Sequence, residues 1–162
     1  MPIGKVSNKD FPACVTSDAN GPENSDQPCD TGSQLDTLRT EFPLVDFSNV
    51  DPVFPDKVSP SASRYAHTRS AILVRGTRCL EELSKRPEKL IFLISHSGFL
   101  RCGVTGWWFF NADYRIFEFD AGWGKPVIKQ DRSTLAGGLG WSWTDPVVLG
   151  LGLPDDKSES LD

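Results

Sequence analysis

The sequence has 162 residues, about the length of one ordinary domain. Its 17 Lys and Arg are outnumbered by 22 Asp and Glu, which gives a formal net charge of −5. This acidic balance argues against nucleic acid or an anionic membrane as a partner, but it leaves room for a small anion in a locally positive pocket. No apolar run approaches the roughly 20 residues that cross a bilayer. The first residues also lack a secretory signal, so we expect a cytoplasmic protein.

The cysteines and histidines give little support to a metal site. The four cysteines are widely spaced and contain no Cys-x-x-Cys pair, which favours free thiols over a disulfide framework. His67 and His96 are the only imidazoles in the sequence. Because structural zinc sites are built from clustered Cys and His, we expect neither a metal nor another cofactor.

The N-terminal part of the chain is rich in turn-forming residues. Residues 1–22 are polar and predict an irregular segment. A short helix is expected over residues 34–41, with Ser33 as its N-cap. Residues 44–60 should form a loop, because prolines interrupt any regular hydrogen-bond ladder there.

The clearest helix is predicted over residues 61–85, where apolar side chains recur every three or four positions. Gly76 weakens the middle of this helix and Pro87 ends it. Residues 90–95, with the sequence LIFLIS, follow after a charged turn. Such a continuous apolar run predicts a strand covered on both faces, as in a parallel sheet.

The C-terminal half predicts shorter elements. A short helix is expected over residues 98–104 and a second strand over residues 114–119. Residues 121–154 form a Gly- and Trp-rich C-terminal extension, in which we expect residues 137–143 to be a flexible cover. Residues 155–162 form an acidic tail that we expect to be disordered.

The most informative position for chemistry is His96, which directly follows the predicted strand. Ser97 and Gly98 lead from it at once into a helix. Ligands of open α/β sheets bind beyond the carboxyl ends of strands, and helix N-termini favour anions. His96 could therefore donate a proton or a hydrogen bond to a phosphoryl oxygen, with Ser97 and Gly98 as phosphate-binding residues. A histidine satisfied by local hydrogen bonds explains the position equally well.

The segment SHSGFLR at residues 95–101 resembles the second histidine motif of the histidine-phosphatase superfamily, especially its fungal phosphoglycerate-mutase-like members. Three further stretches agree with that family in order and spacing, and together the similarity covers roughly residues 23–119. They are ENSDQPCDTGS at residues 23–33, LSKRPE at residues 83–88 and NADYRIFEF at residues 111–119.

The resemblance implies an α/β fold with three layers around a mainly parallel sheet. In the family, a histidine in an Arg-His-Gly motif becomes phosphorylated, a second histidine binds the phosphoryl group, and an acidic residue protonates the leaving oxygen. His96 matches the second histidine, and Glu23 is the candidate general acid. The implied partner is a small phosphorylated or otherwise anionic molecule.

This sequence departs from the family in one respect that bears directly on activity. It contains no Arg-His-Gly, and His67 lies within a predicted helix, where a surface role is favoured. Because a phosphohistidine requires a positioned imidazole nucleophile, we expect weak or no phosphatase or mutase activity. Residues 23–120 would then form a partial, truncated domain that lacks the family's first strand. Unpaired strand edges favour association, so we also expect self-association.

Two other functions stay open at this point. A recruited tailoring enzyme of a fungal small-molecule pathway could use His96 and Glu23 for acid–base chemistry, which needs no phosphohistidine. A non-catalytic module could instead keep an anion-binding pocket around His96.

Overall fold

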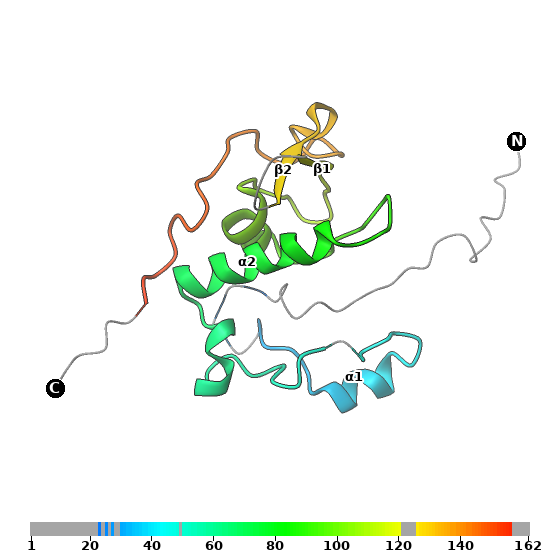
Figure 1. Cartoon of the computed structure of the whole chain (residues 1–162), viewed down its shortest axis with the longest axis vertical. Helices are drawn as coiled ribbons and strands as arrows, with labels where there is room; N and C mark the ends of the chain where they lie inside the picture. Colours follow the sequence, from blue (N-terminus) through cyan, green and yellow to red (C-terminus); the bar gives the residue numbers. More distant parts are fainter. Residues whose placement is uncertain are drawn as a thin grey trace, which may run out of the picture.

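The computed structural model describes residues 23, 25, 27, 30–48, 50–120 and 126–156. Within these residues the structure is mixed α/β, with helical segments and one small antiparallel sheet (Figure 1). The elements, in chain order, are α1 (Leu35–Glu41), η2 (Pro60–Tyr65), α2 (Arg69–Ser84), α3 (Ser97–Phe99), η3 (Leu100–Thr105), β1 (Phe117–Asp120), β2 (Val127–Gln130) and η4 (Arg132–Thr134). The predicted N-terminal segment, residues 1–22, lies outside the described residues.

The long helix predicted over residues 61–85 is two elements. The first is the 3-10 helix η2, and the second is α2, which begins only at Arg69. Thr68 separates them, because its extended backbone makes it the N-cap of α2 and its hydroxyl accepts a hydrogen bond from the Ala71 N–H at 3.4 Å. His67 therefore lies in the connection and not inside a helix, which corrects its predicted setting.

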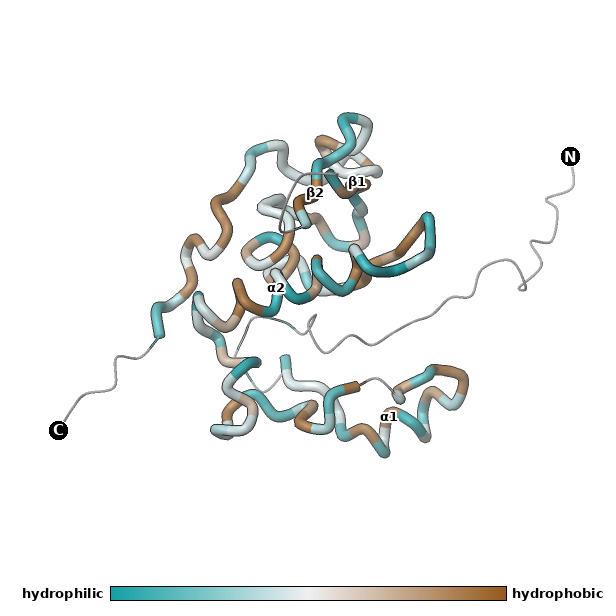
Figure 2. The backbone as a smooth tube through the Cα atoms, in the orientation of Figure 1, coloured by the Kyte–Doolittle hydropathy of each residue, from teal (hydrophilic) through white to brown (hydrophobic). Residues whose placement is uncertain are grey.

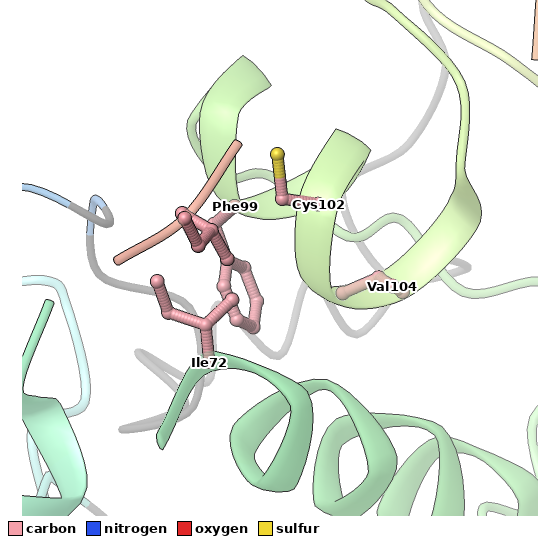
Figure 3. Close-up of a cluster of buried hydrophobic side chains, with 5 residues drawn as sticks. Ile72, Phe99, Cys102 and Val104 are labelled. Carbon is pink, nitrogen blue, oxygen red and sulfur yellow. The ribbon is translucent and has the colours of Figure 1, made fainter. Parts of the chain in front are cut away.

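The core forms where α2 packs against the helical segment that follows His96. Gly76 of α2 and Gly103 of η3 lie so close that a Cβ at Gly76 would overlap the Gly103 carbonyl. This close approach explains the glycine in the middle of α2. The buried cluster around the contact contains Ile72, Phe99, Cys102, Val104 and Leu153, four of which are labelled in Figure 3.

The segment at residues 90–95 is extended, as predicted, but it belongs to no sheet within the described residues. Its apolar side chains are largely exposed, so the predicted cover on both faces is absent there. Figure 2 shows this stretch in brown after the hydrophilic turn that follows α2. Local sequence favours the extended backbone, whereas a neighbouring strand must come from elsewhere. A mainly parallel sheet is therefore not observed in this part of the chain.

The second predicted strand, residues 114–119, forms only in part. β1 begins at Phe117 and pairs antiparallel with β2, with Phe117 opposite Gln130 and Asp120 opposite Val127. The residues before Phe117 make other contacts, because the Ile116 N–H donates to the Thr134 hydroxyl at 3.0 Å. The strand prediction was therefore right in type and about three residues early at its start.

Two N-terminal predictions have different outcomes. The helix expected over residues 34–41 is confirmed as α1, but its N-cap is Gln34 and not Ser33, and no side chain caps it. The loop expected over residues 44–60 is confirmed up to the start of η2. It is held to the core by Asp51, which accepts a hydrogen bond from the Tyr65 hydroxyl at 2.7 Å.

The C-terminal segment, residues 126–156, packs onto the body of the protein. The Gly150 N–H donates to the Cys102 carbonyl and the Arg69 N–H to the Pro154 carbonyl, both at 2.8 Å. Leu153 is 7% exposed and belongs to the core cluster. Of the acidic tail predicted at residues 155–162, the structure describes Asp155 and Asp156, and both contact α2 through Arg69 and Ser70. Among the described residues, no helix is long and apolar enough to cross a membrane.

Candidate functional site

His96 lies where the extended segment turns into a helix. It is the N-cap residue of α3, with an extended backbone, and its carbonyl accepts a hydrogen bond from the Leu100 N–H at 3.0 Å. Its side chain does not cap the helix. The ring nitrogens therefore make their hydrogen bonds away from the helix end. The His96 side chain is 56% exposed.

The structure brings His96 and Glu23 together, although they are far apart in the sequence. The Nδ1 atom of His96 lies 3.3 Å from the Oε2 atom of Glu23, whose side chain is only 21% exposed. A carboxylate beside one ring nitrogen favours the tautomer with a proton there and orients the ring. The other nitrogen, Nε2, is then left for a ligand.

Lys57 forms hydrogen bonds with the backbone at and near Glu23. Its ammonium group donates to the backbone carbonyls of Glu23 at 3.2 Å, Ser25 at 3.3 Å and Asp30 at 2.5 Å. Burial lowers the pKa of Lys57 and the charge of Arg75 lowers it further, while Asp30 and Glu23 act in the opposite direction. Lys57 thus works as a positioning residue that fixes one irregular segment.

Arg75 adds a buried positive charge beside the pair. It lies on α2, is 1% exposed, and stacks its guanidinium over the Phe99 ring at 4.9 Å and the Tyr65 ring at 5.9 Å. Burial lowers the pKa of Arg75 to about 10, and attraction to Tyr65 and Glu23 limits the shift. Arg75 therefore keeps its charge at neutral pH, and the surroundings of Glu23 are locally positive on an acidic protein.

The two predicted phosphate-binding residues begin the helix after His96. The Ser97 hydroxyl donates to the Phe109 carbonyl at 2.8 Å, so its proton is already committed inside the protein. Gly98 is half-buried and contributes no side chain. Only the backbone N–H groups of these residues can serve an anion, because the first N–H groups of a helix have no partner within it.

Arg101, at the end of the histidine motif, stacks its guanidinium over the Trp108 ring at 4.5 Å. A hollow of about 430 Å³ lies elsewhere, against α1, and is lined by neither His96 nor Glu23. The His96 imidazole is half-exposed and lies at the surface, whereas the Glu23 side chain is mostly buried. The residues that line the hollow are Gln34, Leu35, Asp36, Arg39, Phe47, Ser48, Val50, Pro52 and Phe54.

Sequence reasoning missed Arg75 and Lys57. Arg75 carried a usable signal, because it falls on the same helical stripe as Ile72 and Cys79, where an apolar residue is expected. A charge at such a position is buried and therefore needs partners. Lys57 carried no local signal, since it is one lysine in a loop rich in proline.

In the described part of the chain, no three His, Cys, Asp or Glu side chains gather in a group that could hold a metal ion. Comparisons of the chain with protein-family models, with curated proteins and with solved structures found no match.

Proposed function

We propose that this protein is a phosphoglycerate-mutase-like member of the histidine-phosphatase superfamily that binds a small phosphorylated or other anionic molecule and turns it over weakly or not at all. The observation that carries the proposal is the contact of 3.3 Å between His96 Nδ1 and Glu23 Oε2. The two side chains belong to different motifs of the resemblance, and the resemblance implies a role for each.

The chemistry of the pair fits the binding of a phosphoryl oxygen. With Nδ1 directed at Glu23, the His96 ring donates a second hydrogen bond from Nε2 to an anion when both ring nitrogens carry a proton, and the charge of Arg75 lowers the cost of bringing that anion close. The Glu23 carboxyl would exchange a proton with the leaving group. No Arg-His-Gly supplies a nucleophile in this sequence, so covalent transfer through a phosphohistidine is not part of the proposal.

The proposal extends to the finer fold and to the location of the protein. The extended residues 90–95 would be one strand of a mainly parallel sheet in a three-layer domain, as the resemblance implies. Cys79 and Cys102 are buried free thiols, which suits the reducing cytoplasm.

A titration with inorganic phosphate and with a simple phosphomonoester tests the proposal. We expect the imidazole signals of His96 in NMR spectra to shift with phosphate, and His96→Ala to abolish binding measured by calorimetry. His67→Ala is the matched control, because His67 is the other histidine of the sequence, and it should bind as the wild type does. Phosphate release at an ordinary enzymatic rate, lost in His96→Ala, would overturn the claim of weak turnover. Absence of any phosphate-dependent shift would overturn the claim of anion binding.

The recruited tailoring enzyme is the second candidate, and the open position of the pair favours it. A half-exposed imidazole beside a partly buried carboxylate is an acid–base pair that needs no second histidine. Conversion of a phosphate-free substrate, with loss of activity in both His96→Ala and Glu23→Gln, would support this candidate over the first.

A further inference from the structure

The extended segment before His96 has no partner strand among the residues that the structure describes. No hydrogen bond joins the backbone of residues 90–94 to any other described residue. An extended stretch with free N–H and C=O groups is a template for another strand. Since the stretch is also apolar, leaving it in water has a cost that a partner strand would remove.

The exposure of the side chains alternates along the segment, as it does on a strand with one face outward. Leu90, Phe92 and Ile94 are 65%, 77% and 87% exposed, whereas Ile91 is 37% exposed and Leu93 is half-buried. The odd positions therefore face the body of the protein. The even positions form an outward apolar stripe, and the adjoining backbone edge is open.

The sequence of this segment is nearly its own mirror image. When two copies run antiparallel with Phe92 opposite Phe92, Leu90 falls opposite Ile94 and Ile91 opposite Leu93, so every pair is apolar. Beyond Leu90 and Ile94, Lys89 falls opposite Ser95 and then Glu88 opposite His96, an acidic residue against an imidazole. Shifting the alignment by two residues in one direction places Glu88 opposite Ile94 and Lys89 opposite Leu93. Shifting it in the other direction places Leu90 opposite His96 and Ile91 opposite Ser95, so either shift pairs apolar with polar side chains.

We propose that residues 90–94 pair antiparallel with the same segment of a second copy of this chain, about a two-fold axis at Phe92. The interface is isologous, so pairing through this one edge of the strand closes at a dimer. The partner's Glu88 then lies opposite His96, and the dimer adds a carboxylate to the surroundings of the candidate site. This proposal goes beyond the proposed function and does not depend on it.

Sedimentation velocity over a wide range of concentrations tests the dimer directly. Phe92→Lys places two like charges opposite each other at the axis, and we expect it to weaken dimerisation at least about tenfold. Leu44→Lys is the matched control, since Leu44 is an almost fully exposed leucine in a distant loop, and it should leave the dimer intact. A wild-type protein that stays monomeric at every concentration overturns the proposal. This includes a monomer in which another part of the chain protects the amides of residues 90–94 from hydrogen exchange.

Disulfide trapping tests the alignment. In a background without Cys14 and Cys29, Phe92→Cys should form a covalent dimer on mild oxidation, because the two cysteines meet at the axis. Leu90→Cys alone should not, but a mixture of Leu90→Cys and Ile94→Cys should cross-link between the two variants. Cross-linking of Leu90→Cys with itself as fast as Phe92→Cys overturns the alignment. Equal cross-linking of a Leu44→Cys control overturns a specific interface.

Discussion

Gly76 and Gly103 meet backbone to backbone, with the Gly103 carbonyl directed at the place where a side chain of residue 76 would begin. This contact sets the distance between α2 and the helix that follows His96. A glycine within a helix normally lowers stability relative to alanine. Here the loss is offset by packing, since a larger residue would force the two helices apart.

We therefore expect Gly76→Ala to destabilise the protein by about 1–3 kcal/mol despite the better helix propensity of alanine. Denaturant unfolding, with the midpoint and slope both measured, checks the prediction. Val74→Ala, on the exposed side of the same helix, is the control and should change the free energy of unfolding much less. A more stable Gly76→Ala variant would contradict the packing argument.

Arg115 is a buried cation, and its hydrogen-bond partners among the described residues are all backbone carbonyl groups. Its guanidinium donates to the carbonyl oxygens of Trp108, Thr134, Leu135 and Trp143 at distances of 2.6–3.2 Å. Replacing it by methionine leaves these carbonyls without their donor, so we expect a loss of about 3 kcal/mol in the free energy of unfolding.

Calorimetric melting of Arg115→Met measures this loss. Arg132→Met is the control, because Arg132 is exposed, and it should melt close to the wild type. Arg115→Lys should recover only part of the stability, since an ammonium cannot reach carbonyls on several sides as the planar fork does. Full recovery of stability in Arg115→Lys would mean that the positive charge at position 115 stabilises the protein and that the planar geometry of the guanidinium does not.

Asp51 makes part of the stability dependent on pH. Burial acts to raise its pKa, but hydrogen bonds from the Val53 N–H and the Tyr65 hydroxyl, with the charge of Arg64, outweigh burial and lower the pKa. The stabilisation is present above the unfolded pKa of about 4 and is lost as the pH falls through the lower folded value.

Asp51→Asn should therefore be less stable than the wild type by about 1–2 kcal/mol at neutral pH, and the difference should shrink as the pH falls well below 4. Unfolding in urea at several pH values measures both quantities. The control is Asp36→Asn, because the Asp36 side chain is 95% exposed and its ion pair with Arg39 is worth little. A difference that stays constant with pH would show that the Asp51 contacts do not depend on its charge.

Lys57→Met should loosen the backbone around Glu23, since three carbonyls lose their common donor. We expect faster amide exchange of the residues near Glu23, together with weaker phosphate binding if Glu23 must stay beside His96. Lys85→Met, which changes an exposed lysine at the end of α2, is the control. Unchanged exchange would remove Lys57 from its positioning role.

The fold could be predicted where the signal is local and periodic. The apolar spacing of α2 and the turn to a helix after His96 are confirmed, with small errors at the boundaries. The start of α2 was misplaced because one hydroxyl, that of Thr68, decides it. Coverage of residues 90–95 could not be predicted, because local sequence fixes an extended backbone and says nothing of which strand lies beside it.

The site shows the same division. The sequence predicts His96 as a site residue from its place between an apolar run and a helix. It predicts Glu23 only through the family resemblance. Arg75 and Lys57, which surround Glu23 with positive charge, come from a helix and a loop that meet only in the folded chain. The helical spacing marks Arg75 as a buried charge, but nothing in the sequence places it near Glu23.

Leu153 closes the core from a position late in the chain. The ribosome must therefore pass this residue before Ile72 and Phe99 can be fully enclosed, so the protein cannot finish folding segment by segment during synthesis. The apolar segment at residues 90–94 leaves the ribosome well before Leu153 does. Nascent chains on neighbouring ribosomes would then associate through residues 90–94. A chaperone that binds short apolar segments would cover these residues.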